Sequence, residues 1–526
     1  MLKVTFLVQR SLTNRSLTRN GITFAFLFLV VLAGLINLDS SLWWDEGWTL
    51  SVARNWVERG HYGRLLAGQP ASAGLEAAFP VVWPIVASFE LLGVGVFQGR
   101  LPGILFTFGA LALLYHLARQ LFDSSAGWGA LYAVLLLLSL PSVNPILSGR
   151  QALADMPLIF YLLAGHACFL AAWRRPILFM PFSILFWGIA VIAKAQTLPF
   201  WLVSLAVPFL LAFFQRNWRS CGLLLAGVIG SWYASRLLLV LQMQIIGGHT
   251  IPGTPIEGIY QAVALAPYWN VRARSLIVLG ISGLPTLFGL AYFAWRYSRQ
   301  RDELELENGE KVVKLALFVL AGSWLGWFVL LSNGGPRYLA APGFLGGIFV
   351  GKMLEELTAG FDFRSTILRA ANTLKFRQED RSGLSAIFAI VIAVPMAIVT
   401  LAVFYPTILQ GDDTAILTAE YLNENTEPDA LVETYESELF FFLERPYHFP
   451  PDQVHVDLIR RYYFEQDFEI DYDPLAADPD YLVVGPTSAA WRVYELVLET
   501  GAFHLIEENE RYRIYARARV LPKADH

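Results

Sequence analysis

The sequence consists mainly of long apolar runs, and its charged residues gather in the short stretches between them. About eleven runs have the roughly 17–25 residues that a helix needs to cross the hydrocarbon core of a bilayer. They lie near residues 22–38, 101–118, 126–146, 156–173, 176–193, 197–214, 221–243, 275–295, 315–332, 339–355 and 384–408. This pattern predicts a polytopic α-helical membrane protein with about 11 transmembrane helices.

The segment Ala78–Phe97 is also apolar, but it contains Pro80, Pro84 and Glu90. Whether it spans decides on which side of the membrane every later loop lies. Short loops rich in Lys and Arg stay in the cytoplasm. If the segment does not span, one side collects the N-terminus, Arg119, Arg174 and Arg175, Arg216 and Arg219, and the loops 296–314 and 352–381. We therefore expect a cytoplasmic N-terminus, and a surface helix at 78–97 within a first external loop, 40–100.

The composition changes after about residue 408, where acidic and polar residues become frequent. Short periodic segments there predict helices at 413–422, 437–443 and 489–499, strands at 430–434 and 481–485, and a hairpin formed by 503–507 and 511–516. We expect two domains, a membrane domain (1–408) and a small extracytoplasmic α/β domain (409–526).

Overall composition supports a membrane protein and excludes several other classes. Of the 526 residues 55% are hydrophobic and 16% are charged, against about 25% charged in soluble proteins. The net charge of -5 gives no indication of a nucleic-acid partner. Both cysteines, Cys168 and Cys221, lie in apolar runs, so a disulfide framework or a thiolate metal site is not expected.

An acidic pair, Asp45-Glu46, follows the first apolar run and is surrounded by Trp43, Trp44 and Trp48. Aromatic rings favour the membrane interface and carboxylates do not, so the pair suggests a function. A carboxylate at the outer surface could accept a proton from an acceptor group during sugar transfer. The alternative is a solvated turn whose acids pair with Arg54 or Arg59.

Further isolated charges fall on the same predicted outer face. Asp155 begins an apolar helix five residues after Arg150, where a carboxylate can also serve simply to start the helix. Lys194 and Arg337 are fixed cations of the kind that a lipid-phosphate leaving group requires, although either could instead snorkel to phospholipid headgroups. Arg100 is a weaker member of this set. His249, with Glu257 nearby, lies in an external loop and is more simply read as solvated.

These residues occur in an order that resembles the GT-C fold glycosyltransferases. The matching elements are Asp45-Glu46 after the first helix, Gly99-Arg100-Leu101-Pro102, Arg150 with Asp155-Met156-Pro157, Lys194, and Arg337-Tyr338. Within this group the chain looks most like the protein O-mannosyltransferase and ArnT-like branch. The resemblance covers the membrane body, to about residue 408.

The resemblance implies a polyprenyl-phosphate-linked sugar donor, an outward-facing site and inversion at the anomeric carbon. It implies that Asp45 is the base or acceptor-orienting acid, that Glu46 supports it, and that Asp155 helps to form the site. Cations and a tyrosine would face the donor lipid phosphate: Lys194, Arg337, Tyr338, Arg100 and Arg150. ArnT-like members usually carry a Lys-Pro-Pro turn where this chain reads Glu76-Ala77-Ala78-Phe79-Pro80, so the resemblance does not identify the acceptor.

Our prediction is therefore a multi-pass glycosyltransferase of the plasma membrane that transfers a sugar to a glycan, lipid or protein acceptor. No cofactor is expected, since nucleotide-binding glycine motifs are missing from the sequence. A required metal is not predicted either, because the single Asp155 replaces the richer acidic motif of the oligosaccharyltransferase branch. The alternatives are a transporter or flippase of lipid-linked sugars, which should show charges at mid-depth and inverted repeats, and a membrane-anchored sensor.

Overall fold

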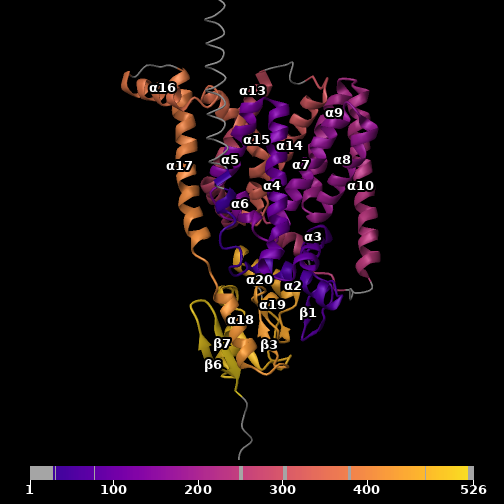
Figure 1. Cartoon of the computed structure of the whole chain (residues 1–526), viewed down its shortest axis with the longest axis vertical. Coiled ribbons are helices and arrows are strands. Elements are labelled where there is room, and N and C mark those ends of the chain that lie inside the picture. Colours follow the sequence, from indigo (N-terminus) through magenta and orange to yellow (C-terminus); the bar gives the residue numbers. More distant parts are fainter. Residues whose placement is uncertain are drawn as a thin grey trace, which may run out of the picture.

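The computed structural model describes residues 28–29, 31–75, 77–247, 253–299, 305–376, 381–467 and 469–518. In this part of the chain a bundle of long helices carries a small α/β domain at one end, and α16 (Phe363–Phe376) lies at the other end (Figure 1). Among the described residues, eight helical segments are long and apolar enough to cross a membrane. The predicted polytopic helical protein with a small C-terminal α/β domain is therefore confirmed.

The candidate spans follow the predicted apolar runs closely. They comprise α4 (Val96–Leu121), α7 (Asp155–Ala172), α8 (Pro176–Ala193), α9 (Thr197–Phe214), α10 (Trp218–Ile246), the continuous segment α12 (Trp269–Val278), η2 (Leu279–Gly283) and α13 (Leu284–Arg299), then α14 (Gly309–Leu330), and a last one that contains α17 (Arg381–Leu409). Short elements connect them: α11 (Ile259–Val263) precedes α12, and the 3₁₀ turn η4 (Pro336–Leu339) follows α14.

The prediction of one spanning helix at 126–146 is wrong. The chain forms α5 (Ser124–Leu136) and then a separate short helix, α6 (Pro145–Gly149). Asn144 stabilises the break, because its side-chain oxygen caps α6 at the Ile146 amide and its Nδ2 donates to the carbonyls of Leu135 and Leu138. Pro141 lies within the same turn and disfavours a continuous helix.

The predicted span at 339–355 is helical, as α15 (Ala340–Leu357), but it is not among the candidate spans. α15 packs closely on α5. A Cβ at Gly351 would lie 2.3 Å from the Ala130 amide nitrogen, and one at Gly129 would lie 2.7 Å from the Gly351 oxygen. Small residues thus allow the two backbones to approach, as is common between membrane helices. Residues 22–27 and 30 of the first predicted run, 22–38, lie outside the described residues.

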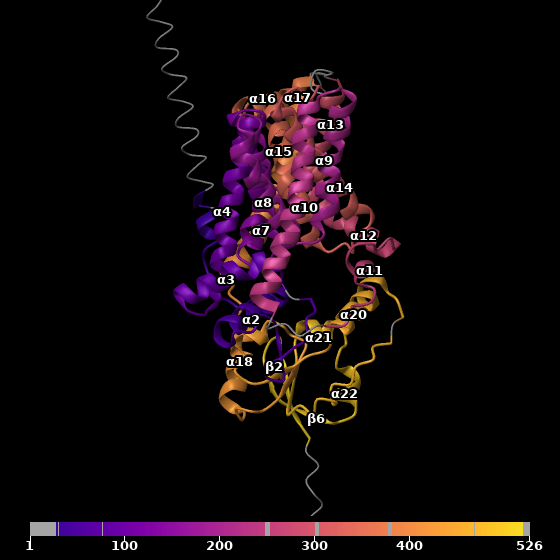
Figure 2. The ribbon, with the colours of Figure 1, turned by 90° about the vertical axis from the view of Figure 1, so that its right-hand side faces the viewer.

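Two shorter helices lie at the end of the bundle that faces the C-terminal domain, α2 (Trp44–Arg59) and α3 (Phe79–Leu92) (Figure 2). Between them, β1 (Leu65–Leu66) and β2 (Gln69–Pro70) form a small antiparallel hairpin. α3 has 14 residues, which is about 21 Å of helix against a hydrocarbon core of about 30 Å. As predicted, this segment is not one of the candidate spans.

The C-terminal domain contains a mixed five-stranded sheet in the order β4-β3-β5-β7-β6. β3 pairs in parallel with β4 and β5, and β7 pairs antiparallel with β5 and β6. The elements are α18 (Thr414–Asn425), β3 (Val432–Thr434), α19 (Leu439–Phe442), β4 (Tyr447–His448), α20 (Asp452–Phe464), β5 (Tyr481–Val484), α21 (Pro486–Ala490), α22 (Glu495–Glu499), β6 (Phe503–Glu508) and β7 (Arg513–Arg517).

Four of these elements differ from the sequence prediction. β4 and α20 were not predicted, and the expected helix at 489–499 is two short helices, α21 and α22. Tyr494 separates α21 from α22, and its hydroxyl donates to the buried Glu433 carboxylate over 2.7 Å. This bond fixes the turn between the two helices against the sheet.

The C-terminal domain is packed directly on the first turn of α2. Trp44 Nε1 donates to the Tyr435 carbonyl over 2.9 Å, and the Ser437 hydroxyl donates to the Trp44 carbonyl. A Cβ at Gly47 would lie 2.2 Å from Glu438 Cα, so only glycine allows this approach. The residues after Trp43 therefore have the membrane helices on one side and the C-terminal domain on the other.

Candidate functional site

Four charged side chains from distant parts of the sequence meet at the junction of the helix bundle and the C-terminal domain. Asp155 Oδ1 accepts from Lys194 Nζ over 2.6 Å, and its Oδ2 accepts from Arg337 Nε over 2.8 Å. Arg337 Nη1 also forms an ion pair with Asp45. The structure thus brings together Asp45, Asp155, Lys194 and Arg337, which the sequence analysis had selected one by one.

Local structure explains how each side chain reaches the junction. Asp45 lies in the first turn of α2, and Asp155 in the first turn of α7, where the helix dipole favours a carboxylate. Lys194 follows the last residue of α8, and Arg337 lies in η4 immediately before α15. All four therefore come from helix ends on the same face of the bundle.

The two carboxylates of this cluster differ in burial. Asp155 is 3% exposed, and its two cationic partners neutralise it. The side chains of Asp45 and Arg337 are 32% and 25% exposed. Burial alone lowers the pKa of Arg337, but the carboxylates of Asp155 and Asp45 outweigh this effect and raise it above its usual value. Arg337 is thus a permanent cation, and its accessible partner is Asp45.

A cavity of about 420 Å³ opens beside Asp45 and Arg337. Its other walls are mostly apolar and come from the start of α2, the loop before α3, the loop before α7 and the end of α8. These lining residues are Trp44, Trp48, Thr49, Leu75, Ala77, Ala78, Leu153, Ala154, Ile192, Ala193 and Ala195, together with His455 of α20. An accessible acid and a cation thus share one open cavity whose other walls come mostly from apolar residues, and such a site could accept a proton and bind a phosphate.

Glu46 lies next to Asp45 in the sequence but is not among the described residues that line this cavity. It is 0% exposed, and both its oxygens accept from Arg100, with Nε–Oε1 at 2.7 Å and Nη2–Oε2 at 2.8 Å. Ala152 N donates to the same carboxylate over 3.1 Å. Arg100 also donates to the carbonyls of Leu38, Ser40 and Ser41. The structure therefore places Glu46 and Arg100 in a buried ion pair that fastens the start of α2 to α4.

Arg150 and Tyr338 also lie away from the cavity lining. Arg150 is 8% exposed and donates to the carbonyls of Ile36 and Asn37 over 2.6 and 2.7 Å, which ties the α6–α7 loop to the segment before α2. Tyr338 lies beside the Lys194 ammonium, whose Nζ is 5.5 Å from the centroid of the tyrosine ring. His249 lies outside the described residues, and the Glu257 amide donates to Gln453.

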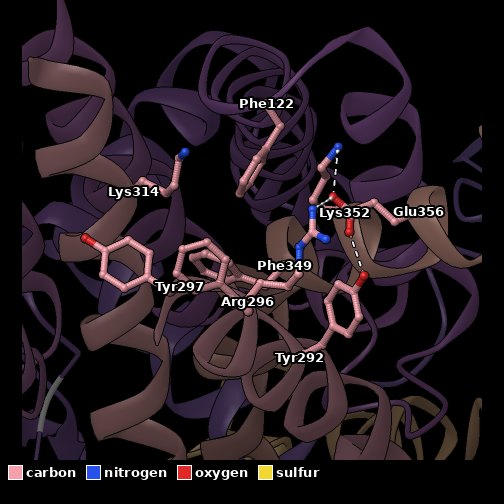
Figure 3. A pocket seen from close by; sticks show the side chains of 9 residues that line it. Phe122, Tyr292, Arg296, Tyr297, Lys314, Phe349, Lys352 and Glu356 are labelled. Carbon is pink, nitrogen blue, oxygen red and sulfur yellow. Dashed lines mark hydrogen bonds and ion pairs between the residues drawn. The ribbon is translucent and has the colours of Figure 1, made fainter. Parts of the chain in front are cut away.

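A second cavity, of about 210 Å³, lies where α13, α14 and α15 meet the end of α4 (Figure 3). Its lining includes Arg296, Lys314, Lys352 and one carboxylate, Glu356. That carboxylate accepts from Tyr292 Oη over 2.6 Å and pairs with Arg296 and Lys352 at 3.3 and 3.5 Å. The Glu356 carboxylate thus already contacts three neighbouring side chains, which makes this cavity a poorer candidate for proton-transfer chemistry.

No group of three or more His, Cys, Asp or Glu side chains within the described residues is arranged to hold a metal ion. The carboxylates nearest the cavity, Asp45 and Asp155, are bridged by Arg337.

The chain resembles known proteins in its fold. Residues 77–237 match the family model described as dolichyl-phosphate-mannose-protein mannosyltransferase. No curated protein matches the chain. Among solved structures, ArnT from Cupriavidus metallidurans bound to undecaprenyl phosphate is 16% identical with a TM-score of 0.62, covering 96% of this chain and 98% of its own.

The archaeal oligosaccharyltransferase AglB from Archaeoglobus fulgidus, in complex with an inhibitory peptide and a dolichol-phosphate, is 13% identical with a TM-score of 0.56. That match covers 96% of this chain and 75% of AglB. The chain therefore has the GT-C-like fold, and its resemblance to the protein O-mannosyltransferase and ArnT-like proteins is confirmed.

Proposed function

We propose that this chain is an integral-membrane glycosyltransferase, which moves a sugar from a polyprenyl-phosphate carrier to an acceptor with inversion at the anomeric carbon. The observation that carries the proposal is the cavity in which the accessible Asp45 carboxylate lies beside the fixed cation Arg337. The undecaprenyl phosphate and dolichol-phosphate named with the structural neighbours ArnT and AglB support the choice of donor.

Asp45 acts as the base in this reaction. Its carboxylate takes the proton from the acceptor group as that group attacks the anomeric carbon. The bond between that carbon and the phosphate oxygen breaks, and its electron pair leaves with the polyprenyl phosphate. One carboxylate is sufficient, because the phosphate leaving group needs no protonation by a second acid.

Arg337 holds the departing phosphate, and Lys194, which contacts Asp155 but is not among the described residues that line the cavity, adds positive charge beside it. A guanidinium has five N–H donors and an ammonium has three, so both groups retain donors beyond those directed at Asp155 and Asp45. Fixed cations at the position where charge develops stabilise the transition state without reorganising. Asp155 touches both cations and serves as a positioning residue for them.

The end of the bundle that carries the C-terminal domain is proposed to face away from the cytoplasm, in the plasma membrane. The positive-inside rule supports this orientation, because the basic segments place α16 and its neighbouring loops on the opposite side. A glycan, lipid or protein would then meet the site at the outer surface.

The proposal is tested with the purified full-length chain in proteoliposomes that contain synthetic labelled polyprenyl-phosphate sugars. The wild type should release free polyprenyl phosphate, and Asp45→Asn should lower that release by about 10²–10⁴-fold while the protein remains folded. Movement of intact labelled lipid without any release would instead indicate a flippase. Activity should persist in EDTA, and its loss with recovery on adding Mg²⁺ or Mn²⁺ would show a metal requirement.

A further inference from the structure

The C-terminal domain supplies one residue to the wall of the cavity, His455 of α20, which lies there with Asp45 and Arg337. Its imidazole is stacked on the Trp44 indole, with ring centroids 5.0 Å apart and an angle of 10° between the planes. His455 thus contacts Trp44, the residue directly before the proposed base Asp45, although Trp44 and His455 belong to different domains.

One ring nitrogen of His455 is already engaged. The Tyr435 hydroxyl lies 2.5 Å from Nδ1, whereas Nε2 makes no hydrogen bond with any residue that the structure describes. Burial lowers the pKa of His455 and raises the pKa of Tyr435, so at neutral pH the imidazole is uncharged and the phenol keeps its proton. We assign the Tyr435 hydroxyl as the donor to Nδ1, which leaves the imidazole proton on Nε2.

α20 is held firmly in this position. Asp452 Oδ2, in the first turn of α20, accepts from Arg64 Nη2 and from the Leu75 amide, each over 2.8 Å. Arg64 is 2% exposed, and its guanidinium lies 3.9 Å from the centroid of Trp48. The loop before α3 and the aromatic start of α2 therefore fix the helix that presents His455.

We propose, on the basis of the function proposed above, that His455 binds the acceptor through its Nε2–H group and selects a hydroxyl nucleophile over an amine. A hydroxyl oxygen has two lone pairs. One accepts the hydrogen bond from Nε2, the other attacks the anomeric carbon, and the hydroxyl proton passes to Asp45 as the carbon–phosphate bond breaks. His455 keeps its own proton throughout.

An amine cannot satisfy the same arrangement. A neutral amine has a single lone pair, which either accepts from Nε2 or attacks, and an ammonium has none. The imidazole donor beside Asp45 belongs to the C-terminal domain. That domain therefore selects the class of acceptor, which is an alcohol.

The test uses the full chain in proteoliposomes with a labelled polyprenyl-phosphate sugar, and two probe acceptors, octyl glucoside and its 6-amino-6-deoxy analogue. His455→Phe retains an aromatic ring against Trp44 but removes the donor. It should lower kcat/KM for octyl glucoside by about tenfold, the worth of one neutral hydrogen bond, and reduce the preference for the hydroxyl acceptor. Transfer to the amino group of the analogue, which cannot accept from Nε2 while it attacks, should fall much less.

His455→Gln, whose amide keeps an N–H group, should recover part of the loss, and His504→Ala, at an exposed position of β6 in the same domain, is the matched control. Unchanged hydroxyl transfer and preference in His455→Phe would overturn the role of His455, as would an equal fall in transfer to the hydroxyl and to the amino group. Failure of the wild type to consume any donor would instead overturn the proposed function on which this inference rests.

Discussion

Asp45 and Glu46 are adjacent carboxylates with different surroundings in the structure. Replacing each by its amide should distinguish a role in activity from a role in stability. Asp45→Asn removes the negative charge from the cavity but leaves Arg337 its second partner, Asp155. Glu46→Gln removes a charge from the buried pair with Arg100. The first change should affect activity, and the second should affect stability.

The environment of each pair sets the expected free energy of unfolding. The side chains of Asp45 and Arg337 are 32% and 25% exposed, so solvent screens the pair, and its loss should cost about 0–1 kcal/mol. The side chains of Arg100 and Glu46 are 6% and 0% exposed. Breaking such a pair from one side leaves an uncompensated buried cation, which costs about 3–5 kcal/mol.

Thermal unfolding in detergent, followed by tryptophan fluorescence, measures the stability of each variant beside its rate of polyprenyl-phosphate release. Glu46→Gln should melt several degrees below the wild type, with activity per folded molecule within a few-fold. Asp45→Asn should melt near the wild type and lose transfer. Glu58→Gln, which breaks the exposed Arg54–Glu58 pair on the same helix, is the control and should change neither. A Glu46→Gln protein of normal stability that is as inactive as Asp45→Asn would refute this division of roles.

Three further outcomes follow from the same geometry. Asp155→Asn leaves two cations facing each other, so it should lower the melting temperature and raise the donor KM; an unchanged KM would contradict the positioning of Lys194 and Arg337. Burial, together with the neighbouring Glu436, raises the pKa of Glu438 to about 8. Because the folded protein then holds a proton that the unfolded chain has lost, stability should fall as pH rises from about 4.5 to 8, and Glu438→Gln should flatten that dependence in melting curves. Gly47→Ala should loosen the C-terminal domain, seen as faster limited proteolysis near residue 410, because its methyl group would overlap Glu438.

The membrane helices could largely be predicted from the sequence, because a bilayer requires long apolar runs whatever their neighbours are. The break between α5 and α6 was missed because apolarity does not reveal a turn that is closed inside the protein by Asn144. Similarly, the sequence shows that Asp155 and Lys194 lie at helix ends, but not that they touch. That contact depends on how α7 packs against α8.

The site was predicted in part, and what was missed has a common cause. Asp45, Asp155, Lys194 and Arg337 are unusual in their apolar surroundings, so each can be noticed alone. His455 lies in an ordinary amphipathic helix of a polar domain, where a histidine attracts no attention. Its place in the cavity depends on contacts between distant parts of the chain, such as the hydrogen bond between Trp44 and Tyr435, which are 391 residues apart. Conversely, Glu46 resembles Asp45 in sequence, and only its burial distinguishes it.

The packing of the C-terminal domain on Trp44 and Gly47 has a consequence for the biosynthesis of the protein. The carboxylate at position 45 is made early by the ribosome, whereas the wall that contains His455 is among the last parts to be synthesised and must reach the same side of the membrane. A nascent chain that has only its membrane helices therefore lacks one wall of this cavity, which becomes complete only when the C-terminal domain has packed on Trp44 and Gly47.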